Sequence, residues 1–188
     1  HGDADLLKSV RIFDGVSNEW IAGAVNRELK VDSTAFISLV NNKSILDSLG
    51  VNANSLEGYL LPGKYLIFER SSPEEVLNHL YSGMNNIFSD SINKHINNLG
   101  RNKHQILTMA SIIEGETKKV EEMPVIAGVY FNRLRIGMRL QADPTIQYLQ
   151  KDGWKRLTYN DLKINSPYNT YLYGGLPPGP ITKKKKNA

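Results

Sequence analysis

The chain has no cysteine among its 188 residues, which excludes disulfide bonds and thiolate metal sites. It also lacks an uninterrupted apolar run of the roughly 18 residues that a membrane-spanning helix needs. The opening residues, HGDADLL, contain neither an initiator methionine nor an apolar signal, as expected of a fragment from which an export or anchoring segment has been removed. Hydrophobic residues make up 40% and charged residues 22%, a balance that favours a globular domain with a hydrophobic core.

A general excess of positive charge is also missing. The formal net charge is +4, and the four consecutive lysines of residues 183–186 account for all of it. A lysine run at a terminus is typical of a solvated, disordered end. We therefore interpret residues 183–188 as a basic tail and expect no nucleic-acid partner.

Several signatures of cofactor chemistry are absent. The four histidines, at positions 1, 79, 95 and 104, do not have the spacing of metal ligands. No phosphate-binding glycine loop and no Ser/His/Asp arrangement appears. We expect no metal site and no cofactor.

The first 53 residues have the pattern of a small αβ unit. An apolar stretch around Val10 predicts a short strand, and Ser17 is placed to cap a following helix. Asp32 or Ser33 can cap the next helix. Gly50 is placed to end a third, shorter helix. Nothing in this unit suggests chemistry.

A turn signal follows this unit. Residues 55–68, SLEGYLLPGKYLIF, have apolar runs on both sides of Pro62 and Gly63, which predicts a hairpin or a sharp turn between extended segments. We place the domain boundary just before it, between residues 1–53 and residues 54–188. The fold class predicted for the whole chain is α+β, with helices around a small mixed sheet.

Two helices with clear start signals follow the turn. Ser72 and Glu75 form a capping box at the start of a long helix, whose apolar stripe can continue toward Gly100. Asn102 and Gln105 can open the next helix. Apolar residues cover most of the circumference of that second helix, which predicts a buried central position: Ile106, Leu107, Met109, Ala110, Ile112 and Ile113.

The remainder of the chain combines two further helices with a long loop. A helix starts at Pro124 and ends at Gly137, and Asp143 with Pro144 has the pattern of an N-cap and a first turn. Residues 165–181, NSPYNTYLYGGLPPGPI, are rich in proline, glycine, asparagine and tyrosine. This composition predicts ordered loop and turn with an aromatic binding surface.

The segment SIIEGETKK, residues 111–119, brings two carboxylates to the end of the apolar central helix. Glu114 lies four residues after Ala110 and seven after Leu107, so it shares their stripe, whereas Glu116 lies on roughly the opposite side. Burial disfavours the charged form of an acid and raises its pKa, and an acid that stays protonated can act as a general acid.

The spacing leaves a structural alternative open for both acids. Glu114 can instead end the helix in an ion pair with Arg133 or Lys118, since structural ion pairs also place carboxylates near cores. For Glu116 the spacing favours a solvated helix face.

Other polar residues are candidates for contacts with a polar ligand, because amides and aromatic platforms suit sugar hydroxyls and sugar faces. A core amide explains Asn132 equally well, an N-cap explains Asp143, and turn chemistry explains Asn169. The candidates are Asn132, Gln141, Asp143, Tyr168, Asn169 and Tyr171.

Four separated motifs resemble, in family order, those of the YceG-like endolytic murein transglycosylases, the MltG family. They are SLEGYLLPGKY, ILTMASIIEGET, IAGVYFNRLRIGMRLQADPTIQY and SPYNTYLYGGLPPGPI. The resemblance covers roughly residues 10–181 and is dense from 106 to 181. Four motifs in order are far more specific than any one of them.

The resemblance implies an enzyme that cuts the MurNAc to GlcNAc β-1,4 bond within peptidoglycan strands without water, leaving a 1,6-anhydro-MurNAc end. It implies a LysM-like subdomain in residues 1–53 and a catalytic domain in residues 54–188. It also implies cooperation with penicillin-binding proteins of cell-wall synthesis. Family members are held by an N-terminal membrane anchor, which this chain does not include, at the outer, periplasmic face of the cytoplasmic membrane.

The resemblance also assigns residues. The family's catalytic glutamate, the first acid of its motif, falls on Glu114, which would act as general acid and then as base. The glycan groove would be lined by the six polar candidates given above. One acid suffices because the sugar's own C6 hydroxyl is the nucleophile, whereas a hydrolase usually needs a second carboxylate.

The sequence departs from the family pattern at two places. The turn at residues 61–65, LPGKY, lacks the family's Asp and Thr, and after Ile181 the family continues with a segment that forms a wall of its active site. We expect that wall to be absent. Two alternatives therefore stay open beside the transglycosylase: a non-catalytic peptidoglycan-binding module and a hydrolytic muramidase.

Overall fold

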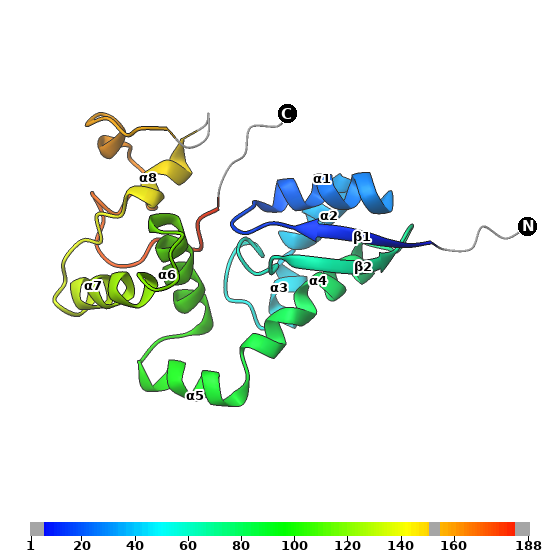
Figure 1. The fold of residues 1–188 in the computed structure, drawn as a ribbon, viewed down its shortest axis with the longest axis horizontal. Coiled ribbons are helices and arrows are strands. Elements are labelled where there is room, and N and C mark those ends of the chain that lie inside the picture. The colour runs from blue at the N-terminus through cyan, green and yellow to red at the C-terminus, as the bar shows by residue number, and fades with distance from the viewer. Residues whose placement is uncertain (1–5, 151–154, 183–188) are drawn as a thin grey trace, which may run out of the picture. The chain divides into compact units, whose positions relative to one another are not determined.

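The computed structural model describes residues 6–150 and 155–182, and the basic tail lies outside them. The chain divides into two compact units, residues 1–99 and 100–188. The predicted α+β class is confirmed, since the described residues form helices together with a small two-stranded sheet (Figure 1). None of the described helices is long and apolar enough to cross a membrane.

The first unit contains both strands of the sheet. Strand β1 pairs with β2 in antiparallel register, from Leu7 opposite Phe68 to Ile12 opposite Gly63. Helix α1 packs against β1, and α4 contacts both β2 and α2. The elements of this unit are β1 (Leu7–Ile12), α1 (Asn18–Leu29), α2 (Ser33–Val40), α3 (Lys43–Ser48), β2 (Gly63–Phe68), α4 (Pro73–Ile87) and α5 (Asp90–Asn98).

The sheet differs from the prediction in its pairing. The partner of β2 is β1, about 50 residues earlier, and residues 55–61 form no strand, so there is no hairpin at Pro62. The first apolar run instead turns into the core, where Leu56, Tyr59 and Leu60 are buried. The sheet is purely antiparallel rather than mixed.

The predicted boundary between residues 53 and 54 does not coincide with the division into units. Strand β2 and helix α4 follow that boundary in sequence but pack with β1 and α2, so they belong to the first unit. The proline and glycine of the turn before β2 do not reveal that β2 pairs with β1, a strand from the start of the chain. The LysM-like character of residues 1–53 stays a prediction.

Helix α4 starts with the predicted capping box. The backbone N–H of Glu75 donates to Ser72 Oγ at 3.2 Å, and Ser72 N–H donates to the Glu75 carboxylate at 2.7 Å. The stripe does not continue to Gly100 as one helix, because Ser89 is extended and α5 starts after it.

Replacing Ser72 by alanine should lower the free energy of unfolding by about 1 kcal/mol, because the cap satisfies an otherwise unpaired N–H group of the first helical turn. Urea unfolding followed by far-UV circular dichroism measures the change. Ser82→Ala is the matched control, since Ser82 is exposed within the same helix and donates only to His79. Equal losses for both variants would contradict the role of the cap.

The second unit is built around α6. This helix contacts both α7 and α8, as the predicted central position requires, and Asn102 and Gln105 form its capping box. No strand occurs in the described residues of this unit. Its elements are α6 (Lys103–Glu116), α7 (Met123–Arg135), α8 (Asp143–Leu149) and the 3-10 helix η1 (Asp161–Lys163).

The core of the second unit joins α6 to α7 and to the final loop. Its buried residues are Met109, Ile112, Ile113, Tyr130, Leu140, Ala142 and Ile181. The loop returns to α6 through two hydrogen bonds: Ile181 N–H donates to Ser111 Oγ at 2.9 Å, and the His104 ring bonds the Pro178 carbonyl at 2.7 Å. As predicted, residues 165–181 form ordered turns without a regular element.

Candidate active site

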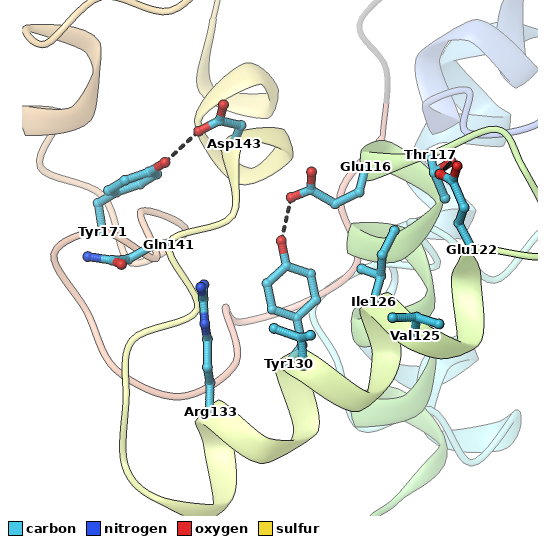
Figure 2. Close-up of a pocket in the computed structure, with 11 residues that line it drawn as sticks. Glu116, Thr117, Glu122, Val125, Ile126, Tyr130, Arg133, Gln141, Asp143 and Tyr171 are labelled. Atoms are coloured by element: carbon cyan, nitrogen blue, oxygen red, sulfur yellow. Dashed lines mark hydrogen bonds between the residues drawn. The ribbon is translucent and has the colours of Figure 1, made fainter.

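A pocket of about 410 Å³ opens in the second unit, a volume suited to a small ligand or a sugar unit. One wall is apolar and comes from the exposed side of α7, with Val125, Ile126 and Val129. Polar groups from α6, from α7, from the start of α8 and from the final loop line the rest of the pocket (Figure 2). A ligand with both apolar faces and hydroxyl groups matches this lining.

Glu116 is the acid that reaches this pocket. It lies three residues after Ile113, four after Ile112 and seven after Met109, so it continues the buried face of α6. Glu116 is the last residue of the helix, beyond the end of the core, and is therefore exposed as a residue while its carboxyl group points into the pocket (Figure 2).

The surroundings of the Glu116 carboxyl raise its pKa above the usual value for glutamic acid. Loss of hydration is the main cause, and the nearby charge of Asp143 adds to it. A hydrogen bond from the Tyr130 hydroxyl and the positive charge of Arg133 act in the opposite direction without cancelling the rise. The protonated form of Glu116 therefore persists to higher pH than in an ordinary surface glutamate.

Glu114 lies outside the pocket. Its carboxylate is 3.6 Å from Lys118 Nζ, which matches the ion-pair alternative for this residue. The stripe of Leu107 and Ala110, from which the burial of Glu114 was predicted, is not the buried face of α6, since Ala110 is exposed. Of the two acids of this segment, Glu116 lines the pocket and Glu114 does not.

Asp143 provides a second carboxylate in the same pocket. The Tyr171 hydroxyl donates to it at 2.5 Å (Figure 2). Burial, then the bond to Asp143, raises the pKa of Tyr171 to about 12. The predicted N-cap role of Asp143 is wrong, because Ala142 holds the cap position and no side chain caps α8.

A group of hydrogen bonds fixes the final loop against the start of α8. The backbone N–H of Ala142 donates to Thr170 Oγ1 at 3.0 Å, and Thr145 Oγ1 lies 2.9 Å from the same oxygen. Gln141 N–H donates to the Thr170 carbonyl at 3.1 Å. These bonds hold Tyr171 beside Asp143.

Gln141 lines the pocket in a left-handed backbone conformation, with φ of 51°. A side chain other than glycine rarely adopts this conformation, which costs of the order of 1 kcal/mol and recurs at functional sites. The bond to Thr170 helps to maintain it.

Three of the six predicted groove residues meet at the pocket: Gln141, Asp143 and Tyr171. The other three do not line it. Asn132 is exposed elsewhere on α7, and Tyr168 packs against Tyr148, with ring centroids 4.9 Å apart. Asn169 is fully buried.

The buried amide of Asn169 stabilises a turn, which was the alternative to a glycan contact in the sequence analysis. Its Nδ2 donates to the carbonyls of Leu162 and Ile164 at 3.0 and 2.8 Å, and its Oδ1 accepts from Tyr171 N–H at 2.9 Å. Asn169 therefore shapes the loop that carries Tyr171.

The structure adds two residues to the predicted groove residues: Tyr130, which the sequence did not single out, and Arg133, for which a salt bridge was the commoner expectation. Tyr130 donates to the Glu116 carboxyl, and Arg133, one turn later on α7, lies with its guanidinium carbon 5.8 Å from the centre of the Tyr130 ring. Arg133 also donates to the Leu140 carbonyl. Their three-residue spacing puts both on one face of α7, a signal that the sequence carried.

The pocket thus combines an acid of raised pKa, two further carboxylates (Glu122 and Asp143) and several hydroxyl and amide groups beside an apolar wall. Within residues 6–150 and 155–182, no group of three His, Asp or Glu side chains is arranged to hold a metal ion. Glu116 can serve as a general acid toward a ligand held against the wall.

Known proteins similar to this chain come from bacteria. The chain is 32% identical over 189 residues to the endolytic murein transglycosylase of Bacillus subtilis, covering 92% of this chain and 52% of that protein. It is 34% identical over 170 residues to the endolytic murein transglycosylase of Streptococcus pneumoniae serotype 2, covering 85% of this chain and 31% of that protein. The chain therefore spans about half the length of the first relative and less of the second.

Structure and family comparison agree. The crystal structure of a putative YceG-like protein from Listeria monocytogenes matches with a TM-score of 0.81 and 29% identity, over 96% of this chain and 64% of that chain. The model of the YceG-like family matches residues 2–188. The chain belongs to the YceG-like family.

Proposed function

We propose that this chain is an endolytic lytic transglycosylase of peptidoglycan glycan strands, with Glu116 as its catalytic acid and base. The observation that carries the proposal is the position of Glu116, an acid of raised pKa that opens into a pocket of suitable size. The names of the relatives in Bacillus subtilis and Streptococcus pneumoniae support the reaction class.

In the proposed reaction, protonated Glu116 gives its proton to the glycosidic oxygen as the bond from that oxygen to C1 of MurNAc breaks. The resulting carboxylate then accepts the proton of the C6 hydroxyl of the same sugar, and O6 forms a bond to C1. The products are a free hydroxyl on GlcNAc and a 1,6-anhydro-MurNAc end. Glu116 returns to its protonated form, and no water is consumed.

The walls of the pocket support this assignment of substrate. The apolar side chains of α7 suit the flat face of a sugar ring, and Gln141 and Tyr171 offer polar groups for hydroxyls or amides. We also propose the cell envelope as the location, because peptidoglycan lies outside the cytoplasmic membrane.

One observation favours a second candidate, a hydrolytic muramidase. Asp143 does not cap a helix, and its carboxylate shares the pocket with Glu116. A pair of carboxylates is what most glycoside hydrolases use, one as acid and the other as base or nucleophile. Against this role, Asp143 already accepts a hydrogen bond from Tyr171.

Mass spectrometry of the products separates the candidates. The chain is incubated with purified peptidoglycan glycan strands, and we expect fragments with anhydro ends, one water lighter than hydrolysis products. Reducing ends would identify a muramidase. Binding of strands without any cleavage would identify a non-catalytic binding module.

A further inference from the structure

We propose that Tyr130 is a positioning residue for the acid of the reaction: its hydroxyl holds Oε1 of Glu116, so that the proton to be transferred resides on Oε2. This inference rests on the proposed function of Glu116.

Tyr130 is rigid where Glu116 is not. The Tyr130 side chain belongs to the core of the second unit and is only 6% exposed, so its hydroxyl has a fixed position. Glu116 is an exposed residue at the very end of α6, where a helix has few constraints. A bond from the fixed hydroxyl therefore orients the carboxyl of Glu116.

The Tyr130 hydroxyl makes a hydrogen bond to the Glu116 carboxyl that no other described group duplicates. It donates to Glu116 Oε1, and no other group in the described part of the chain makes a hydrogen bond to that carboxyl (Figure 2). Burial and the proximity of Glu116 raise the pKa of Tyr130 well above the usual value for tyrosine, so the hydroxyl keeps its proton and remains a donor.

Other charged and titratable groups share the pocket with Glu116. Arg133 comes from α7, Glu122 precedes α7, Asp143 comes from α8 and Tyr171 from the final loop. Asp143 favours the protonated form of Glu116 and Arg133 favours the ionised form. Neither makes a hydrogen bond to the carboxyl of Glu116. Both change how readily Glu116 ionises, whereas Tyr130 also fixes one of its oxygens.

The bond from Tyr130 has a defined consequence during the reaction. A hydrogen bond donated to a carboxyl group is stronger when that group is ionised. The bond therefore stabilises the carboxylate that forms as Glu116 gives up its proton, and it lowers the pKa of the acid from the higher value that burial alone would set. Tyr130 itself exchanges no proton with the substrate.

The test compares Tyr130→Phe with the unchanged chain and with Tyr173→Phe as a matched control. Tyr173 lies in the final loop outside the pocket and donates its hydroxyl to Asn165 at 2.6 Å. The carboxyl of Glu116 is titrated by carbon-13 NMR in all three proteins, and kcat and KM for glycan cleavage are each measured against pH.

We expect Tyr130→Phe to raise the pKa of Glu116 and to lower kcat about tenfold, with little change in KM. A general acid must be protonated, so activity falls as pH rises through its pKa, and this fall should move to higher pH in the variant. Tyr173→Phe should change neither the titration nor the profile.

The titration of Glu116 tests the role of Tyr130, and the rate of glycan cleavage tests the proposed function. An unchanged titration of Glu116 in Tyr130→Phe would overturn the inference, whatever the activity. A shifted titration in a chain that cleaves no glycan would support the hydrogen bond and overturn the proposed function.

A reciprocal measurement applies if Tyr130→Phe does not fold. In Glu116→Gln the negative charge beside Tyr130 is lost, so the pKa of the Tyr130 hydroxyl, followed by carbon-13 NMR of labelled tyrosine, should fall. No change in that pKa would contradict the contact on which the inference depends.

Discussion

Glu116→Gln is expected to lower the rate of glycan cleavage by about 10²–10⁴-fold, the usual contribution of a general acid. Glutamine has nearly the same size and still accepts the hydrogen bond from Tyr130, but it has no proton to give. The loss should therefore appear in kcat rather than in KM, since the contacts that bind the strand are kept.

Glu114→Gln is the matched control for this prediction, two residues earlier on the same helix. Glu114 forms a partly exposed ion pair with Lys118 outside the pocket, and such pairs contribute little to stability. We expect this variant to cleave at close to the original rate. Initial rates on purified glycan strands, with circular dichroism to confirm folding, measure both variants.

The reverse result would restore the assignment made from the motif resemblance alone. If Glu114→Gln abolished cleavage while Glu116→Gln retained it, the pocket described here would not be the catalytic centre. If both variants retained cleavage, neither acid of the segment would be the general acid.

The choice between the two acids shows what the sequence of α6 leaves undecided. Nearly every side of α6 carries apolar residues, so two stripes fitted the sequence, one through Leu107 and Ala110 and one through Met109 and Ile112. Only the packing of α7 and α8 against α6 selects the second stripe, which leads to Glu116. A helix that is apolar all round does not reveal from its own sequence which face its partners cover.

Local signals were read correctly where local chemistry decides the structure. The caps at Ser17, Asp32, Ser72 and Asn102 form as predicted, because each side chain bonds backbone groups within three residues. The pairing of β2 with β1 could not be predicted in this way, since it joins segments about 50 residues apart. The same limit explains Asp143, whose partner Tyr171 comes from a distant loop.

Asn169→Ala is expected to lower the free energy of unfolding by about 3 kcal/mol, because it removes the three hydrogen bonds of a fully buried amide. The Asn169 amide now satisfies the carbonyls of Leu162 and Ile164 and the N–H of Tyr171. Alanine keeps none of these bonds and leaves a small void in the loop. Urea unfolding measures the loss, with Asn165→Ala as the matched control.

Asn165 lies four residues earlier in the same loop, is exposed, and accepts a single side-chain bond from Tyr173. Its removal should cost less than about 1 kcal/mol, because water can replace the lost bond. Cleavage by Asn169→Ala should also fall at temperatures where the variant is still folded, since Tyr171 loses its backbone support beside Asp143. A variant with unchanged stability would mean that the loop holds its shape without the amide.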